Sequence, residues 1–359
     1  MDKVNFLTFQ KDDLLSYLEL MGEKQYRAKQ LWKWVYTKGI KSFDEMTDIS
    51  DSLKKKLKLK INIPRLDIHT HQKSIDGTQK WLFNLEDNKK IETVYIPEED
   101  RGTLCISSQV GCTLSCSFCH TGTMPLVRNL KVNEIIAQVL TVKDSLLDWS
   151  NKKDNRKITN IVFMGMGEPL YNYNAVLKAS RVLLDNEGLC YSRRKITLST
   201  SGVVPFINKL KKELEVSLAI SLHAVKDDIR NELVPINKKW PISELLSVLK
   251  NYPGVNNSRR ITFEYVMLDE VNDSIEDAKA LVKLLKPLHA KVNLIPFNPW
   301  PGSKYKCSSS QKIKQFADHV CYKGGIVATV RQPRGQDILA ACGQLKSNSV
   351  RMQKEKVLI

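Results

Sequence analysis

From about residue 102 onward, short apolar, β-branched runs alternate with longer segments in which apolar residues recur every three or four positions. The short runs predict strands and the longer segments predict amphipathic helices. One such helical face is formed by Val132, Ile135, Ile136, Val139 and Leu140. Strands are predicted at residues 104–109, 158–164, 195–200, 215–222, 261–268, 291–296 and 325–330. We therefore predict an α/β fold in which six or seven βα units form a full or partial barrel, with functional residues after the strands.

The pattern differs before residue 100. Segments 11–21, 24–37 and 43–59 predict three short helices, which end at Gly22 and Gly39 in the first two cases. Asp51 or Ser52 is the candidate N-cap of the third helix. These helices would form a small domain over residues 1–65.

Alternating apolar residues in segments 78–85 and 90–96 predict a β-hairpin. The hairpin would lie in an extension over residues 66–101, which leads into a barrel over residues 102–345. Residues 346–359 form a polar, basic tail that we expect to be mobile.

The helical domain mixes basic and aromatic residues, and two interpretations are open. The mixture is suited to contacts with an RNA backbone and bases, which would make this an RNA-binding accessory domain. Alternatively, the aromatic side chains form a core and the basic ones are a solvated face. The residues concerned are Lys24, Arg27, Lys29, Lys33, Lys38 and Lys41, with Trp32, Trp34 and Tyr36.

Composition and charge narrow the class of protein. The 359 residues are 42% hydrophobic and 26% charged, which is typical of a globular protein. A formal net charge of +17 favours nucleic acid over a small acidic metabolite as the partner. No segment is long and apolar enough to span a membrane, and Asp2, Asp12 and Asp13 bracket an apolar stretch too short for a signal peptide. We expect a cytoplasmic protein, in which the eight cysteines do not form a disulfide scaffold.

Three cysteines carry the most specific chemistry. Cys112, Cys116 and Cys119 are spaced C-x3-C-x2-C, and no second cysteine pair follows at the distance usual for structural zinc. Three thiolates on one short loop can hold a 4Fe-4S cluster and leave one iron open. A cluster of buried structural cysteines, or an atypical zinc site, is the alternative.

Further polar residues follow the predicted strands. Gly167 would let the backbone approach a ligand, and Glu168 could accept from an ammonium group. Hydroxyl, imidazole and amide partners for a ribose and an adenine are offered by Ser199, the segment Ser221, Leu222 and His223, and Asn298. Taken singly, each of these is more often a satisfied structural residue, and His223 in particular would be a structural histidine by default.

Several stretches together resemble the RlmN/Cfr family of radical SAM RNA methyltransferases. These are ETVYIP at 92–97, LCISSQVGC at 104–112, GMGEPL at 165–170 with Asn172, NLIPFNP at 293–299, and the segment from RG at 334–335 to AACGQL at 340–345. The resemblance covers nearly the whole chain. It implies a partial (β/α)6 barrel with an N-terminal helical domain, a 4Fe-4S cluster, and two S-adenosylmethionine molecules per turnover.

The resemblance also implies the reaction and its partners. Its best match is C2 methylation of an adenosine in 23S rRNA and of the purine next to the anticodon in tRNA, by a monomer that draws electrons from a donor such as flavodoxin. Cys342 would carry the methyl group and form a transient adduct with RNA. Cys105 would then resolve the adduct and leave a disulfide bond, and Glu92 would accept the C2 proton. Without the resemblance, Cys105 would be assigned to a strand core and Glu92 to an exposed strand position. The other cysteines, Cys190, Cys307 and Cys321, match no catalytic position and are predicted to pack.

Three alternatives remain. A Cfr-type enzyme would methylate C8 of the same ribosomal adenosine, but Pro169 stands where that type has alanine, which favours C2. The chain also differs from the residues most common in the family at His120, at residues 122–126, and at Gln332 and Pro333. These differences affect fine substrate preference. The remaining two are a radical SAM enzyme with another substrate and a non-enzymatic, zinc-dependent RNA-binding protein.

Overall fold

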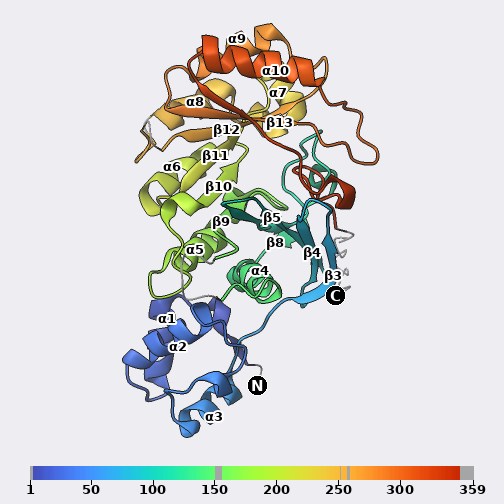
Figure 1. Ribbon diagram of the computed structural model, residues 1–359. Coiled ribbons are helices and arrows are strands. Elements are labelled where there is room, and N and C mark those ends of the chain that lie inside the picture. Colours follow the sequence, from blue (N-terminus) through green and yellow to red (C-terminus); the bar gives the residue numbers. More distant parts are fainter. Residues whose placement is uncertain (1–2, 150–155, 251, 257–258, 348–359) are drawn as a thin grey trace, which may run out of the picture.

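A ten-stranded sheet forms the centre of the computed structural model, which describes residues 3–149, 156–250, 252–256 and 259–347 (Figure 1). The strand order is β14-β13-β12-β11-β10-β9-β6-β5-β4-β3. Seven strands run parallel to their barrel neighbours: β6 (Gly102–Cys105), β9 (Asn160–Phe163), β10 (Ile196–Thr200), β11 (Ser217–Ser221), β12 (Ile261–Met267), β13 (Ala290–Pro296) and β14 (Val327–Val330). The predicted parallel sheet is thereby confirmed.

Helices connect these parallel strands and pack against the sheet. They are α4 (Val132–Ser145), α5 (Tyr173–Leu184), α6 (Val204–Glu213), α7 (Asp227–Leu233), α8 (Ile242–Lys250), α9 (Ile275–Leu285) and α10 (Ser310–Asp318). In α9, for example, Ser274 and Asp277 form a capping box, while Leu281 and Leu285 are fully buried. Within the described residues β14 and β3 are the two ends of the sheet, so six βα units form a partial barrel, as predicted.

The predicted hairpin is present as β4 (Gln79–Asn84) and β5 (Lys90–Pro97). A third antiparallel strand, β3 (Asp67–Lys73), was missed, because all seven of its residues are exposed and it has no apolar alternation. Since β5 pairs antiparallel with β6, the extension continues the barrel sheet.

The predicted strand at 104–109 is wrong as a single element. It is divided into β6, which ends at Cys105, and β7 (Gln109–Val110), which pairs with β8 (Arg128–Asn129). Ser107 lies at the break, where its N–H donates to Gln138 Oε1 at 2.8 Å and its hydroxyl donates to the Glu92 carbonyl at 2.6 Å. Side chains thus replace the ladder hydrogen bonds, and the chain turns into the cysteine loop.

The N-terminal region contains α1 (Lys11–Leu20), α2 (Tyr26–Tyr36) and α3 (Asp51–Lys60), with a small sheet of β1 (Val4–Asn5) and β2 (Ile61–Asn62). The single helix predicted over residues 43–59 is wrong: Phe43–Glu45 is a separate 3-10 turn. The N-cap of α3 is Ser50, whose side chain accepts from the Leu53 N–H, and not Asp51 or Ser52.

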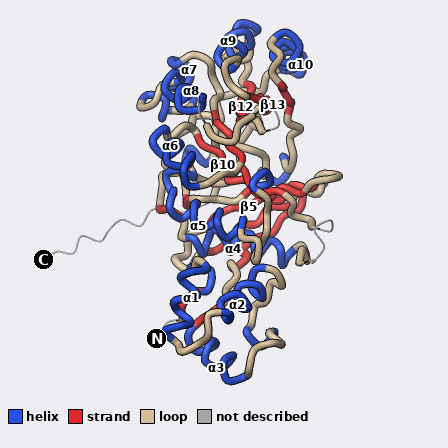
Figure 2. The backbone as a smooth tube through the Cα atoms, turned by 90° about the vertical axis from the view of Figure 1, so that its left-hand side faces the viewer, coloured by secondary structure: helices blue, strands red, loops and turns tan. Residues whose placement is uncertain are grey.

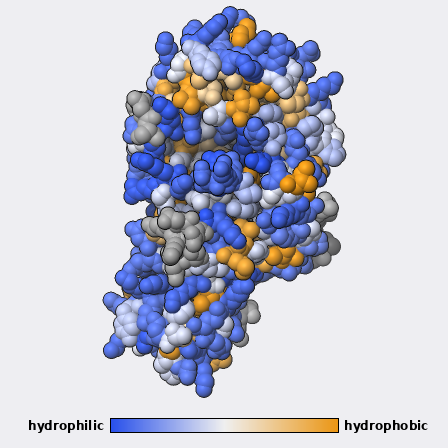
Figure 3. Space-filling model, viewed as in Figure 1, coloured by the Kyte–Doolittle hydropathy of each residue, from blue (hydrophilic) through white to orange (hydrophobic). Residues whose placement is uncertain are grey.

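The three aromatic residues of the basic and aromatic mixture, Trp32, Trp34 and Tyr36, belong to the core, as the second of the two interpretations expects. Trp32, Trp34 and Tyr36 are all buried, and Trp32 contacts Tyr36 edge to face at 4.6 Å between ring centroids. Lys24 and Lys33 are exposed. In the space-filling view the part of the molecule formed by α1 to α3 is mainly hydrophilic (Figure 3). These three aromatic side chains are therefore not available to stack on RNA bases, whereas Lys24 and Lys33 remain available to phosphates.

The N-terminal region packs directly on the barrel (Figure 2). Trp32 Nε1 donates to Asp185 Oδ1 at 3.2 Å, and Arg65 Nε donates to Asp144 Oδ2 at 2.8 Å. Gly39, with φ of 72°, has no room for a side chain, because a Cβ there would lie 2.2 Å from the Trp149 ring. Most of the predicted tail, residues 348–359, lies outside the described residues. No helix in the described ranges is long and apolar enough to cross a membrane.

Candidate active site

The cysteine loop opens into the main cavity of the barrel. Cys112, Cys116 and Cys119 all line this cavity, which has an empty volume of about 990 Å³. Two glycines shape the loop: a Cβ on Gly111 would lie 2.1 Å from the Pro125 carbonyl oxygen, and one on Gly122 would lie 2.5 Å from that of Cys116. The three sulfurs are therefore directed into one cavity by a tightly packed backbone.

The surroundings of the three thiols fit a bound metal cluster. Burial raises the pKa of Cys112 to about 12 and raises the pKa values of Cys116 and Cys119. A neighbouring cysteine raises each value further: Cys119 acts on Cys112 and Cys116, and Cys342 acts on Cys119. Without a cation these side chains are neutral thiols, so they would become ligands only beside strong positive charge. In the described part of the chain, no three His, Cys, Asp or Glu side chains are arranged to hold a single metal ion. A 4Fe-4S cluster requires a wider arrangement, in which each of the three thiolates would bind a different iron.

Glu168 lies in the same cavity, in the loop after β9. Its Oε1 accepts from the Leu170 N–H at 3.0 Å and its Oε2 accepts from the Ser201 N–H at 2.8 Å. Burial raises the pKa of Glu168 to about 7, and the two N–H groups oppose this shift. Gly167 has φ of 97°, and a Cβ there would lie 2.5 Å from the Gln109 Cβ. Only glycine fits where the backbone at position 167 passes so close to Gln109.

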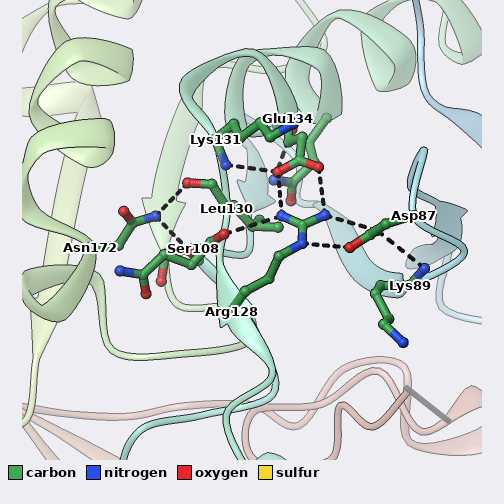
Figure 4. Close-up of polar contacts among 10 residues, drawn as sticks. Asp87, Lys89, Ser108, Arg128, Leu130, Lys131, Glu134 and Asn172 are labelled. Atoms are coloured by element: carbon green, nitrogen blue, oxygen red, sulfur yellow. Dashed lines mark hydrogen bonds and ion pairs between the residues drawn. The ribbon is translucent and has the colours of Figure 1, made fainter. Parts of the chain in front are cut away.

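Polar contacts fix the position of this loop against the cysteine loop (Figure 4). Asn172 Nδ2 donates to the carbonyls of Ser108 and Leu130, both at 2.8 Å. Arg128 binds both oxygens of Glu134 at 2.8 Å, and it also donates to Asp87 in the turn between β4 and β5. These bonds hold the segments on either side of the cysteine triad to α4, to the hairpin and to the loop after β9.

Later strands bring four of the predicted residues to the cavity wall, namely Ser199, Ser221, His223 and Asn298. His223 has φ of 60°, and its Nδ1 accepts from the Val266 N–H at 3.1 Å. Burial lowers the pKa of His223 to about 3, so the ring is neutral at physiological pH. Its ring contacts Phe118 of the cysteine loop edge to face at 4.7 Å. Leu222 is the exception, because its side chain is fully buried and does not line the cavity.

Cys342 also lines the cavity, on the segment after β14. The His120 N–H donates to the Gly343 carbonyl at 2.7 Å, and His120 Nδ1 donates to the Gln344 carbonyl at 3.2 Å. The His120 ring stacks on Trp300 at 4.6 Å with an interplanar angle of 7°. The residue after the third cysteine of the triad is thus bonded to both residues that follow Cys342.

The turn between β3 and β4 holds this segment from the other side. Asp76 Oδ2 accepts from the Gly335 N–H at 2.8 Å, and the Ser74 hydroxyl donates to Asp337 Oδ1 at 2.6 Å. Lys80 Nζ donates to a carbonyl of the same segment at 3.3 Å. No local sequence pattern predicts these contacts. The extension therefore helps to position Cys342.

Glu92 and Cys105 are buried and do not line the cavity. Burial, with a further contribution from nearby Cys342, raises the pKa of Cys105 to about 12. Glu92 lies 3.2 Å from Lys80 Nζ and accepts from the Lys346 N–H at 2.7 Å. Burial raises the pKa of Glu92, although Lys80 opposes the shift. The expectation from sequence alone, that Glu92 would be an exposed strand residue, is wrong.

Sequence reasoning missed two groups at the site. Arg230 is fully buried and donates to the carbonyls of Leu222 at 2.9 Å and Ser201 at 2.8 Å, which ties together the ends of β10 and β11. Glu264 is buried in the cavity wall beside Arg331. Neither residue could be recognised from the sequence, because the contacts of each are made with residues of other strands and loops.

The three remaining cysteines differ in their environments. Cys190 and Cys321 are half-buried, whereas Cys307 is exposed. The prediction that all three pack in the interior is therefore wrong for Cys307.

A partial barrel of six βα units, with a C-x3-C-x2-C loop after its first parallel strand, defines the class of radical SAM enzymes. Residues 106–284 match the family model of the Radical SAM superfamily, and residues 4–63 match that of the ribosomal RNA large subunit methyltransferase N-terminal domain. The chain belongs to the RlmN family, as its similarity to proteins of that name shows.

Two relatives and one solved structure illustrate the similarity. The dual-specificity RNA methyltransferase RlmN of Bradyrhizobium diazoefficiens is 54% identical over 98% of this chain and 90% of its own length. That of Parvibaculum lavamentivorans is 58% identical over 92% of this chain and 85% of its own length. The crystal structure of a radical SAM methyltransferase from Sphaerobacter thermophilus has a TM-score of 0.87 and 42% identity, and the match covers 95% of this chain and 98% of that one. These findings do not favour the other radical SAM or zinc-protein alternatives.

Proposed function

We propose that this enzyme methylates C2 of an adenosine in 23S rRNA and of the adenosine next to the anticodon in tRNA. The observation that carries the proposal is the bonding of the cysteine loop to the Cys342 segment through His120. This bonding keeps a candidate methyl-carrying thiol at the cavity that the cysteine triad lines. A radical SAM enzyme acting on an unrelated substrate would have no need for that connection.

The cavity residues divide between two cofactors. Cys112, Cys116 and Cys119 would hold a 4Fe-4S cluster, and Gly167, Glu168, Ser199, Ser221, His223 and Asn298 would hold S-adenosylmethionine. Leu222 would contribute only through its backbone. When bound, the two cofactors supply methyl groups and a carbon radical, which can react at the electron-poor C2 of adenine where a polar methyl transfer cannot.

Three side chains of the protein would carry out the remaining steps. The Cys342 sulfur takes the methyl group and, through that carbon, joins C2 of the adenine. Glu92 accepts the C2 proton, since burial raises the pKa of its carboxyl group and makes the carboxylate a stronger base. The Cys105 thiol then attacks the Cys342 sulfur, so that the carbon–sulfur bond breaks and a disulfide remains. The released carbon takes a proton to complete the methyl group, and the methylated RNA leaves.

The proposal includes partners and location. The net charge of +17 and the exposed lysines of the N-terminal region support RNA binding. An external electron donor such as flavodoxin would reduce the cluster and the disulfide. We propose that the enzyme works as a monomer in the cytoplasm, where both RNA substrates are found.

The test is mass spectrometry of ribosomal and transfer RNA from a strain lacking the gene. Restoring the intact gene should produce 2-methyladenosine in both RNAs, and restoring a Cys342→Ala gene should not. If 8-methyladenosine appears instead, the Cfr-type reaction is the correct one. Methylation of only one RNA would limit the proposal to that substrate.

A further inference from the structure

A second, smaller cavity adjoins Cys342. It has an empty volume of about 260 Å³ and shares Ile295, Asn298, Arg331 and Cys342 with the main cavity. The cysteine triad and Glu168 line only the main cavity, while Arg334 lines only the smaller one. Cys342 therefore stands between the proposed cofactor site and a separate space that contains two arginines.

The two arginines have no partner in the described part of the chain. Neither the Arg331 nor the Arg334 guanidinium makes a hydrogen bond or ion pair there, although both side chains are half-buried. Arg230, by contrast, donates to several carbonyls and to an amide. A guanidinium in a partly buried position ordinarily has its donors satisfied. Two guanidinium groups that line one cavity and have no protein partner within the described residues are typical of a site for an anionic ligand.

The acidic side chains near Arg331 and Arg334 are bonded to other residues. Glu264 accepts from Asn293 Nδ2 at 2.7 Å, and Glu98 forms an ion pair with Arg101. The backbone of Arg331 is fixed, because its N–H donates to the Leu294 carbonyl at 2.8 Å at the end of β14. The Cys342 and Cys105 thiols, Glu264 and Glu98 all raise the pKa of Arg331, so its charge is permanent. The smaller cavity thus holds positive charge next to Cys342.

We propose that Arg331 and Arg334 bind a backbone phosphate of the RNA, namely a phosphodiester flanking the adenosine that is methylated. This inference rests on the proposed function. The target base has to reach Cys342 from the side that the cofactors do not fill, and its flanking phosphates then lie toward the smaller cavity. Guanidinium groups match phosphate oxygens in geometry and charge, and such contacts fix the register of a nucleic acid. The two arginines would therefore position the adenosine at the Cys342 sulfur.

The first test is the salt dependence of RNA binding. Cluster-loaded enzyme without reductant is titrated with a tRNA anticodon stem-loop at several salt concentrations, so that no turnover occurs. Arg331→Gln and Arg334→Gln should each lower the slope of log K against log salt, and the double variant, which loses the one phosphate contact, should lower it by about 1. Arg193→Gln is the matched control: Arg193 precedes β10, at the opposite end of the strand from Ser201, and is paired with Glu215. Unchanged slopes in both cavity variants would overturn the inference.

The second test identifies the phosphate. Stem-loops are made with an uncharged methylphosphonate linkage on the 5′ or the 3′ side of the target adenosine. One of these linkages should weaken binding of the wild type to the same degree as Arg334→Gln does, and the combination should be no weaker than either change alone. Fully additive losses at both linkages would show that the arginines contact something else.

Two measurements distinguish phosphate binding by the arginines from binding of S-adenosylmethionine by them and from failure of the proposed function. Methylation of Cys342 by S-adenosylmethionine, followed by intact-protein mass, should be retained in Arg334→Gln, since Arg334 lines only the smaller cavity. If the variants instead lose affinity for S-adenosylmethionine while their salt slopes stay at the wild-type value, the arginines bind its carboxylate and the inference is wrong. Failure of the proposed function is distinct, because the wild-type enzyme itself would then produce no 2-methyladenosine.

Discussion

His120 is bonded through its backbone to Gly343, with 2.7 Å between the His120 nitrogen and the Gly343 carbonyl oxygen. One residue follows the third cysteine of the triad, and the other follows Cys342. The connection spans more than 220 residues of sequence, and the His120 side chain adds a second bond to Gln344. One backbone hydrogen bond and one imidazole therefore help to set the position of the candidate methyl carrier relative to the cysteine loop.

We expect His120→Ala to loosen the Cys342 segment while the cluster still assembles. The substitution removes the ring that stacks on Trp300 and the bond to Gln344, but none of the three cysteines. The rate of RNA methylation should fall about tenfold or more, because misplacement of a reacting group by about 1 Å lowers a reaction rate by at least this factor. Hydrogen exchange in residues 340–345 should become faster. His120→Asn, which can still donate to the Gln344 carbonyl, should recover part of the loss, and equal exchange rates in all three proteins would count against the positioning role.

Cys116→Ala should remove the iron. Two thiolates rarely retain a 4Fe-4S cluster, so the anaerobically purified variant should be colourless and should not cleave S-adenosylmethionine. Iron and sulfide analysis makes the measurement. Cys307→Ala is the control, because Cys307 is exposed and lies outside the cavity wall. Full iron content in Cys116→Ala would contradict the cluster assignment.

The two proposed catalytic thiols should give opposite results on substitution. Cys342→Ala cannot accept a methyl group and should form no RNA adduct. Cys105→Ala should accept the methyl group and join C2, but it lacks the thiol that breaks the carbon–sulfur bond, so enzyme should accumulate attached to RNA. Denaturing gels with and without ribonuclease reveal the adduct. A methylated Cys342 without any adduct in Cys105→Ala would mean that Cys105 is not the resolving thiol.

Binding of S-adenosylmethionine should weaken as the pH falls through about 7. The pKa of Glu168 is raised by burial to about 7, so the carboxyl is mostly neutral at pH 6 and mostly ionised at pH 8. Only the ionised form can pair with the ammonium of the ligand, and the affinity should drop on the order of tenfold between pH 8 and pH 6. The dissociation constant is measured on cluster-loaded enzyme. Glu168→Gln should bind weakly with a flat profile, since the pKa of His223, about 3, keeps that ring neutral throughout. A flat profile in the wild type would refute this role of Glu168.

Arg230→Ala should lower the free energy of unfolding by about 3 kcal/mol, because it leaves several buried carbonyls at the ends of β10 and β11 without a donor. Thermal or denaturant unfolding measures the change. The control Arg193→Ala removes an exposed ion pair and should change stability by less than about 1 kcal/mol. Similar values for the two variants would show that the buried hydrogen bonds of Arg230 contribute little.

Local sequence determined much of this protein. The alternation of apolar runs with helical periodicity was enough to predict the parallel sheet, since each element must bury its own apolar face. The C-x3-C-x2-C spacing placed three thiols on one loop, because neighbouring residues cannot be far apart in space. The hairpin around Asp87 was visible for the same reason.

Only the tertiary structure decided what lies opposite each of these elements. β3 is fully exposed and has no apolar pattern, so its pairing with β4 could be recognised only in the folded sheet. The bonds of Asp76 to Gly335 and of His120 to Gly343 join residues more than 220 positions apart, and no local preference encodes such partners. The two arginines beside Cys342 are likewise ordinary basic residues in the sequence. Their lack of partners among the residues that the structure describes depends on how the strands close around the cavity, which is a property of the whole fold.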